Sequence, residues 1–158
     1  MHPQVSAALD AAQVAYTERR HADYPATIAS PADFAAALGY AVERISKTLF
    51  LRASDQQAYA AVTCSVVKKL DLPALAAHFG WRRAQVASRD ELLAATGYQP
   101  TGVSPLGIAN CPVVLDAGLF DFPTILIGGG EVGVEIELTP AALQRAAHAT
   151  VLSITLPS

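Results

Sequence analysis

A run of three glycines, Gly128–Gly130, separates two apolar segments that both read as β-strands. The second segment, 132–138, alternates aliphatic residues with Glu135 and Glu137, and a period of two is typical of a strand with one buried face. Two such segments, 124–127 and 132–138, joined by glycines form an antiparallel hairpin. We therefore expect at least one antiparallel pair, with both glutamates on a solvated face.

Helix signals alternate with strand-like runs along the rest of the chain. Serine before a proline at Ser30-Pro31, and the Ser88–Glu91 spacing of a capping box, each open a helix. The expected helices cover 3–15, 31–39, 71–79 and 88–96, with a last one starting at 139–140. The expected strands cover 16–21, 42–51, 59–67, 83–87, 112–116, 124–127, 132–138 and 151–156. Interleaved helices around an antiparallel hairpin predict an α+β fold with a mixed sheet flanked by helices.

The composition fits one compact domain spanning 1–158. The chain is 52% apolar and 16% charged, which excludes a disordered protein. Its net charge of −3 argues against a general nucleic-acid coat, and the basic pairs Lys68-Lys69 and Arg82-Arg83 are expected on the surface. No apolar run reaches membrane-spanning length and the start does not resemble a signal peptide, so we expect a cytoplasmic protein with no membrane contact.

Familiar catalytic and metal-binding sets are weak. The four histidines are scattered without metal-ligand spacing, and no Gly-x-Ser-x-Gly elbow is present. Cys64 and Cys111 lie in apolar surroundings and are expected to be small buried side chains. His21 precedes an irregular stretch and could border a pocket. We expect no metal and no cofactor.

Lys47 is the one charge in the strand-like run 45–51. A long amine in such a run is costly unless its ammonium reaches a polar cavity. One interpretation is that Lys47 faces a ligand site, and the other is that it extends to water at a sheet edge.

Two loops could complete such a site. The segment 101–107 places Gly102 between two prolines, so it can direct main-chain N–H groups at one point, as oxyanion sites do, and Ser104 adds a hydroxyl. The alternative is an ordinary surface loop. The glycine run Gly128–Gly130 matches neither a P-loop nor a dinucleotide fingerprint, and serves either a wide turn or the close approach of a ligand to backbone.

The motifs occur together, in order, from about residue 20 to the C-terminus. They are Ile45-Ser46-Lys47-Thr48-Leu49, Leu70-Asp71-Leu72 with Ala76 and Gly80, Thr96-Gly97-Tyr98, Gly102-Val103-Ser104-Pro105-Leu106-Gly107, Leu115-Asp116-Ala117, and Gly129-Gly130 followed by Gly133 and Glu135-Ile136-Glu137-Leu138. In this set the chain resembles the YbaK / prolyl-tRNA-synthetase-associated editing domains, which are aminoacyl-tRNA deacylases.

The resemblance implies a mixed sheet partly rolled into a barrel, and a pocket that receives the 3′ end of a charged tRNA. It implies Lys47 as the catalytic residue. The substrate-binding set expected on this basis is Thr48, Thr101, Gly102, Val103, Ser104, Pro105, Gly128, Gly129 and Glu135, with His21 at its border. The chain departs from the family pattern at Thr101, Gly128 and Glu135, and lacks an aromatic residue expected near Arg19 and Arg20. These departures bear on which amino acid is removed.

Several functions remain open from the sequence. The leading one is trans-editing of Cys-tRNA(Pro), and the nearest competitor is Ala-tRNA(Pro), whose branch usually shows Lys-Asn where this chain has Lys47-Thr48. A silent module that binds a tRNA end, a nucleotide or a synthetase is a second class, and a small-molecule ester hydrolase a third. Water, a ribose hydroxyl or the substrate's own side chain would attack the ester. Recruitment through prolyl-tRNA synthetase or an elongation factor is expected.

Overall fold

The computed structural model describes residues 1–157. Within them, the α-helices are α1 (Pro3–Ala12), α2 (Pro31–Leu38), α3 (Leu72–Phe79), α4 (Arg89–Thr96) and α5 (Pro140–Ala147). The strands are β1 (Thr17–Arg20), β2 (Ser46–Ala53), β3 (Tyr59–Ser65), β4 (Ala84–Val86), β5 (Val113–Asp116), β6 (Ile125–Gly128), β7 (Val134–Leu138) and β8 (Thr150–Leu152). Single turns of 3₁₀ helix are η1 (His21–Asp23), η2 (Val42–Arg44), η3 (Pro100–Gly102) and η4 (Ala117–Asp121).

The helices begin and end where local chemistry places them. Side-chain oxygens accept a main-chain N–H of the first turn at Ser30, Asp71, Ser88 and Thr139, and the Ser88–Glu91 capping box is complete. Glycines in the left-handed conformation end α2, α3 and α4 at Gly39, Gly80 and Gly97. These ends agree with the sequence-based prediction because they depend on neighbouring residues.

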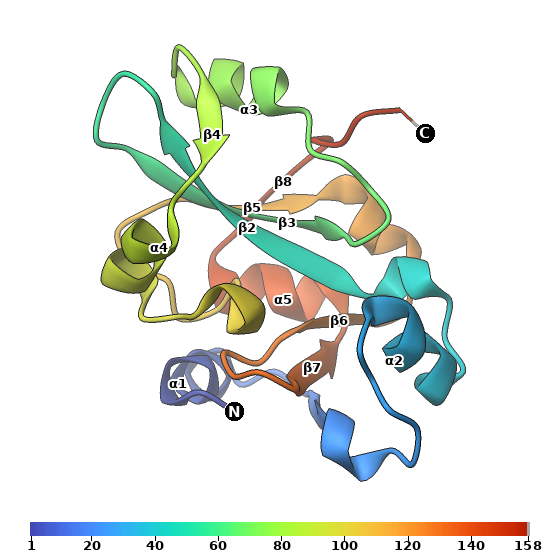
Figure 1. Ribbon diagram of the computed structural model, residues 1–158. Coiled ribbons are helices and arrows are strands. Elements are labelled where there is room, and N and C mark those ends of the chain that lie inside the picture. The colour runs from blue at the N-terminus through green and yellow to red at the C-terminus, as the bar shows by residue number, and fades with distance from the viewer. Residues whose placement is uncertain (158) are drawn as a thin grey trace.

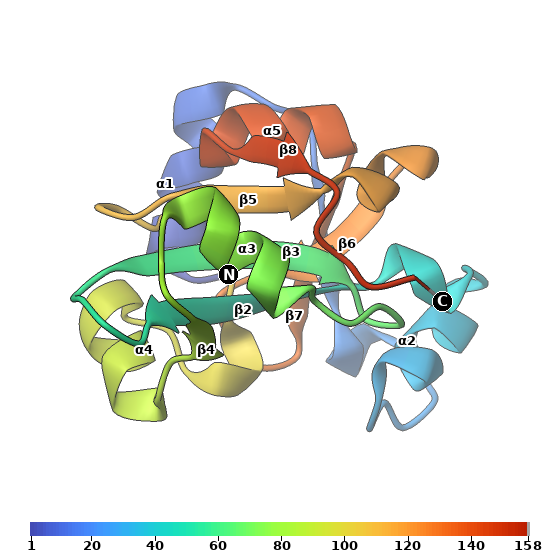
Figure 2. The same ribbon diagram turned by 90° about the horizontal axis from the view of Figure 1, so that it is seen from above.

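The strands form two sheets. One has the order β1-β7-β6 and is antiparallel, with Gly128 opposite Glu135, which confirms the predicted hairpin. The other has the order β4-β2-β3-β5-β8, in which β3–β5 and β5–β8 are parallel. Figures 1 and 2 show β2 as the long strand crossing the molecule, with α4 near one end and α2 near the other. The predicted mixed α+β fold is therefore confirmed.

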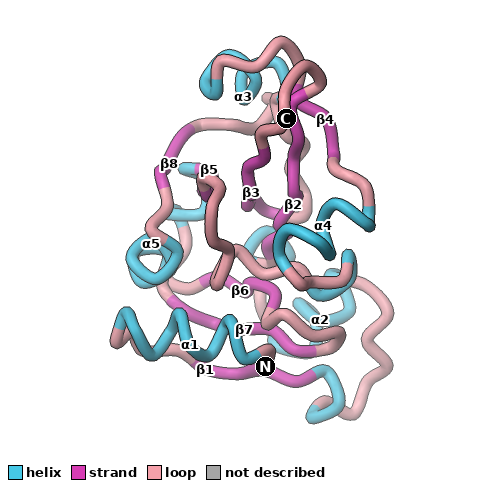
Figure 3. The backbone as a smooth tube through the Cα atoms, turned by 90° about the vertical axis from the view of Figure 1, so that its left-hand side faces the viewer, coloured by secondary structure: helices cyan, strands magenta, loops and turns pink. Residues whose placement is uncertain are grey.

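The two sheets meet beside the start of β2. Ile45 forms an isolated parallel bridge with Leu126 on β6, and the buried Ser46 hydroxyl donates to the Leu126 carbonyl at 2.6 Å. Among residues 1–157, no continuous ladder closes the two sheets into one, so the partial barrel stays a prediction. Figure 3 shows α3 beyond the five-stranded sheet, and β6, β7 and α1 at the opposite end of the molecule.

The core follows this layering. The largest buried cluster joins α1, α5 and the β6–β7 hairpin through side chains such as Leu9, Leu143 and Ile136, and a second joins α3 to the five-stranded sheet through Leu75 and Leu51. In residues 1–157, every helix is too short or too polar to cross a membrane.

Three expected element bounds are wrong by three residues or more. The helix expected over 3–15 ends at Ala12, because Gln13 adopts the left-handed conformation. Residues 42–44 form η2, not strand, because the Ile45 N–H turns back to the Val42 carbonyl at 3.0 Å. The closing strand is β8 at Thr150–Leu152, earlier than 151–156, because pairing ends where Leu152 lies opposite Asp116.

Candidate active site

A cavity of about 540 Å³ lies between the first half of β2, the segment 28–34 and the turn that joins β6 to β7. Its lining combines apolar side chains with polar groups from segments far apart in the sequence. The predicted site residues that line it are His21, Lys47, Thr48, Thr101, Val103, Gly128 and Glu135. Gly102, Ser104, Pro105 and Gly129 are not part of the lining. The fold thus gathers seven predicted residues around one space.

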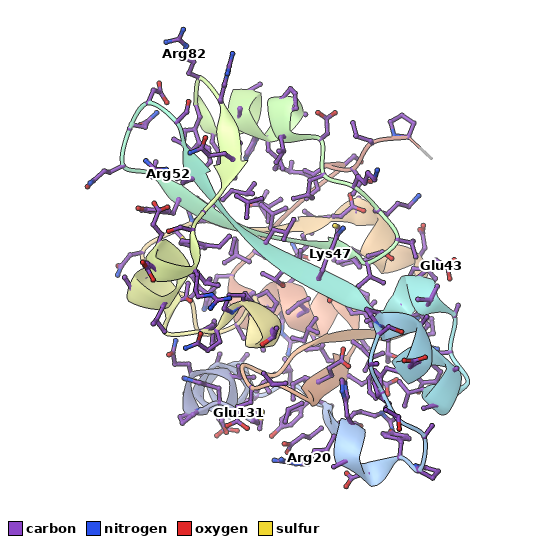
Figure 4. The ribbon with its side chains drawn as sticks, viewed as in Figure 1. Arg20, Glu43, Lys47, Arg52, Arg82 and Glu131 are labelled. Atoms are coloured by element: carbon purple, nitrogen blue, oxygen red, sulfur yellow. The ribbon has the colours of Figure 1, made fainter. Side chains whose placement is uncertain are left out.

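Lys47 reaches this cavity from β2 and is only partly buried. Figure 4 labels Lys47, the second residue of β2, on the long strand, with Glu131 of the β6–β7 turn lower in the view. Within residues 1–157, no side chain or carbonyl lies at hydrogen-bonding or ion-pairing distance from its ammonium. An ammonium left without an intramolecular partner on a cavity wall is suited to bind an oxygen of a ligand.

Cys64 lies directly opposite Lys47 on β3. Burial raises the pKa of its thiol to about 11, although the charge of Lys47 acts in the other direction. Because a thiolate is needed for nucleophilic attack, the raised pKa makes Cys64 unsuited to act as a nucleophile. Its burial confirms the prediction of a small buried side chain.

His21 and Glu135 form a pair on the cavity wall. The His21 Nε2 atom lies 2.7 Å from Glu135 Oε2, and the imidazole packs on the Phe34 ring with centroids 4.6 Å apart. Burial raises the pKa of the Glu135 carboxyl, and the hydrogen bond with His21 opposes that shift. The pair places two polar side chains on a wall of the cavity that is otherwise lined largely by apolar side chains.

The expectation that Glu135 and Glu137 share a solvated face is wrong. Glu137 is only 8% exposed and accepts hydrogen bonds from Arg19 at 2.7 Å, Tyr40 at 2.9 Å and Thr124 at 2.6 Å. Burial alone would raise its pKa, but these hydrogen bonds outweigh burial and hold the pKa below its usual value. Glu137 is buried because β1 and the 24–44 segment pack over this face of β7 and supply hydrogen-bond donors to its carboxylate.

The glycines of the two loops are explained by contact between main chains. A Cβ atom on Gly128 would overlap the Val103 carbonyl oxygen, and one on Gly102 would come within 3.2 Å of the Glu131 backbone. On Gly129 it would lie 2.9 Å from the Val134 carbonyl oxygen. The 100–103 segment therefore packs directly on the β6–β7 turn. This close packing, which forms one wall of the cavity, is possible because these glycines have no side chain.

Some polar groups of the 101–107 loop already form hydrogen bonds within or next to the loop. The Gly102 N–H donates to the Gln99 carbonyl at 2.9 Å, and the Leu106 N–H donates to the Ser104 hydroxyl at 3.2 Å. Ser104 is fully buried. Neither the Gly102 amide nor the Ser104 hydroxyl is presented to the cavity, so in this structure the loop shapes the cavity wall through Thr101 and Val103.

Part of the cavity wall comes from residues outside the predicted site. Segment 28–31 and Phe34 form one wall, and Ser46 lies beside Lys47. Phe34 lies in the predicted helix 31–39, and the pattern of that helix alone gives no signal that its side chain lines a cavity. In residues 1–157 no group of three or more His, Cys, Asp or Glu side chains is arranged to hold a metal ion.

Comparisons of the sequence with known proteins find a matching family. The model of the aminoacyl-tRNA editing domain matches residues 25–146, which include Lys47, Thr101 and Glu135. The chain is 34% identical over 109 residues to the uncharacterised protein YwhH of Bacillus subtilis, covering 68% of each chain. It is 30% identical over 122 residues to EbsC of Enterococcus faecalis, described as a candidate Cys-tRNA(Pro)/Cys-tRNA(Cys) deacylase, covering 77% of this chain and 74% of EbsC.

Solved structures share the fold. A candidate trans-editing enzyme for prolyl-tRNA synthetase superposes with a TM-score of 0.81 at 23% identity, covering 99% of both chains. The hypothetical protein APE2540 superposes with a TM-score of 0.84 at 24% identity, over 97% of this chain and 99% of that one. At these identities the likeness establishes the fold.

Proposed function

Because this chain belongs to the aminoacyl-tRNA editing domain family, whose members are aminoacyl-tRNA deacylases, we propose that it removes cysteine from mischarged tRNA(Pro) with Lys47 as the catalytic residue. The observation that carries the proposal is the unpartnered Lys47 ammonium on the wall of a cavity inside the family-matched region. We further propose that the activity belongs to a single domain spanning 1–158 and operates in the cytoplasm.

Hydrolysis of an aminoacyl ester depends more on stabilising the developing negative charge than on a strong nucleophile. Attack on the ester carbonyl carbon places negative charge on the carbonyl oxygen, and collapse breaks the bond to the ribose oxygen, which takes a proton to become a hydroxyl. Lys47 is placed to stabilise that charge or an adjacent oxygen of the tRNA end. Losing one such donor typically lowers the rate by about 10² to 10³. Water supplies the oxygen that appears in the released amino acid.

Cysteine is favoured over alanine on two grounds. EbsC, described as acting on cysteinyl-tRNA, is a relative of this chain, and Thr48 stands where the alanine-specific branch usually has asparagine. The departures at Thr101, Gly128 and Glu135 all lie on the cavity wall, so they are positioned to change the preferred amino acid. Alanyl-tRNA(Pro) is therefore the first competitor to test.

The deciding experiment is a deacylation panel. Purified protein is incubated with Cys-tRNA(Pro), Ala-tRNA(Pro), Cys-tRNA(Cys) and Pro-tRNA(Pro), and the loss of each ester is followed over time. Fastest hydrolysis of Cys-tRNA(Pro) supports the proposal, and fastest hydrolysis of Ala-tRNA(Pro) replaces cysteine by alanine. Tight tRNA binding with no turnover would favour a silent binding module instead. Adding prolyl-tRNA synthetase or an elongation factor to the panel tests recruitment, which we expect to increase the rate at low tRNA concentration.

Substitution of Lys47 tests its role directly. Lys47→Ala is expected to lower the deacylation rate by about 10²-fold or more while leaving the melting temperature near that of the wild type, because the ammonium has no partner among residues 1–157. Lys69→Ala is the matched control, since Lys69 is exposed and lies outside the cavity lining. Wild-type turnover by Lys47→Ala would remove Lys47 from the mechanism.

A further inference from the structure

The cavity meets β2 where that strand lacks a paired neighbour on one side. On the side away from β3, β4 pairs only with Leu51–Ala53. At the other end, pairing with β6 is limited to the isolated bridge at Ile45, next to the hydrogen bond from the Ser46 hydroxyl to the Leu126 carbonyl. Between these contacts, the edge of β2 around Thr48 faces the cavity, whose lining includes residues 45–49. The sheet therefore has a short open edge inside the candidate site.

The register of β2 with β3 fixes where the Thr48 main chain points. The Ala53 N–H donates to the Ala58 carbonyl at 2.9 Å, so odd-numbered residues of β2 direct their main-chain groups toward β3. Even-numbered residues direct theirs to the other side, as the Phe50 carbonyl does in accepting from the Ala87 N–H at 2.9 Å. The Thr48 N–H and C=O therefore point together toward the open edge.

On this side no strand is paired with Thr48, and among residues 1–157 no main-chain bond from a turn or loop reaches its N–H or C=O. The Thr48 side chain is engaged elsewhere, since its hydroxyl lies 2.8 Å from that of Thr63. Main-chain donors and acceptors at an open strand edge are a template for hydrogen bonding with an added strand, and polar main-chain groups rarely remain without a partner. A ligand of strand-like shape in the cavity would satisfy both.

We propose that the aminoacyl group of the charged tRNA binds as a one-residue extension of this sheet, paired antiparallel with Thr48; this rests on the proposed function. An aminoacyl ester carries a nitrogen donor and a carbonyl acceptor on either side of one α-carbon, as a strand residue does. In a hydrogen-bonded pair the α-ammonium donates to the Thr48 carbonyl, and the ester carbonyl accepts from the Thr48 N–H. Addition to a strand edge thus recognises the group common to all aminoacyl-tRNAs.

This pairing assigns positions to the rest of the substrate. In an antiparallel pair the next position along the ligand lies opposite Lys47, so the ester oxygen and ribose pass beside the free ammonium. The amino acid side chain lies on the same face as that of Thr48, where Val103 and Phe50 pack in one cluster. The Thr48 N–H then faces the oxygen on which charge develops, and acts together with Lys47.

Hydrogen exchange in the presence of a stable analogue tests the pairing without turnover. The probe is 3′-(L-cysteinylamino)-3′-deoxyadenosine, in which an amide replaces the ester, and adenosine is the control. We expect the analogue at saturation to slow exchange of the Thr48 amide at least tenfold, and adenosine to leave it unchanged. Unchanged exchange at Thr48, whether other amides slow or not, would overturn the inference.

Substitution at Thr48 provides a second test. Thr48→Pro removes the N–H that points to the cavity, and proline is tolerated at a strand edge where that N–H is not part of the ladder. We expect a folded protein whose single-turnover deacylation falls by about 10²-fold or more. Thr48→Val keeps the N–H and loses only the hydroxyl, so its loss should be several-fold smaller. Equal losses in a folded Thr48→Pro and in Thr48→Val would contradict the main-chain role.

The two tests separate this inference from the deacylase function. Inactivity of the wild type on every charged tRNA would reject the proposed function, and slower exchange at Thr48 with the analogue would still support the pairing. Conversely, an active wild type with no change of exchange at Thr48 would keep the function and reject the pairing.

Discussion

At the scale of single residues, the cavity wall depends on how closely two main chains approach. Gly128 lies against the Val103 carbonyl oxygen, with no room for a Cβ atom. Its φ lies outside the left-handed region, so the requirement for glycine here is one of space rather than of backbone conformation. A side chain at this position must displace the 100–103 segment and open the wall that holds Thr101 and Val103.

Gly128→Ala is accordingly expected to lower the free energy of unfolding by about 2 to 3 kcal/mol through steric overlap. Gly39→Ala is the contrasting control, because Gly39 has φ +71° and open space around it, so only backbone strain of about 1 kcal/mol applies. Chemical denaturation of the two variants measures the difference. A loss at Gly128 no larger than that at Gly39 would show that the 100–103 segment yields easily.

At the scale of elements, β7 joins the cavity to the rest of the fold through its two glutamates. Glu135 is hydrogen-bonded to His21 at the cavity. On the same face, Glu137 accepts hydrogen bonds from Arg19 of β1, Tyr40 and Thr124. A buried carboxylate with several donors fixes the neighbours that surround it. Glu137 therefore holds β1 and the segment after α2 against β7, which supports the wall next to His21.

The lowered pKa of Glu137 predicts a specific response to acid. A folded-state pKa below the unfolded value adds stability that is fully present above about pH 5 and is lost as the pH falls through the folded-state pKa. Glu137→Gln removes this contribution and should lower the free energy of unfolding at pH 7 by about 1 to 3 kcal/mol. Denaturant titrations at pH 7 and pH 3 check both parts.

The control is Glu43→Gln, because Glu43 is exposed on η2 and has no ion pair among residues 1–157. It should leave stability at pH 7 nearly unchanged. If Glu137→Gln lost as much stability at pH 3 as at pH 7, the ionised carboxylate would not be the stabilising form.

At the scale of the whole molecule, two sheets are joined beside the start of β2. The junction consists of the Ile45–Leu126 bridge and the buried hydrogen bond from the Ser46 hydroxyl to the Leu126 carbonyl. Lys47 is the next residue, so its position relative to the β6–β7 turn depends on this junction. The shape of the cavity therefore depends on the contact between the two sheets.

Ser46→Ala should lower the free energy of unfolding by about 1 to 2 kcal/mol, because it removes a buried hydrogen bond and leaves a carbonyl with one donor fewer. It should also raise KM more than it lowers kcat, since the cavity shape changes while Lys47 remains. Ser65→Ala is the matched control. Ser65 lies opposite Ser46 and is also buried, but within residues 1–157 its hydroxyl accepts just one local bond, from the Val67 N–H at 3.4 Å. Similar losses in both variants would argue against a special role for the junction.

Helix ends and the hairpin were predictable because each depends on residues close in the sequence, and the mixed α+β class followed from the order of these elements along the chain. Ser88 caps with its own neighbours, and Gly128 turns the chain that contains it. Pairing of strands that are distant in the chain was not predictable by the same means. The turn at 42–44 was mistaken for strand because its apolar Val42 fits either structure until packing decides.

The sequence by itself determined the elements, the family resemblance and the importance of Lys47, since a charge inside a strand-like run already requires a polar environment. Only the tertiary structure decided which partners surround each group. It buried Ser104, bonded the Gly102 amide, covered Glu137 with donors, and left the Thr48 edge open. The physical reason is that hydrogen-bond satisfaction and close packing depend on what lies opposite in space, and that partner is often a hundred residues away in the chain.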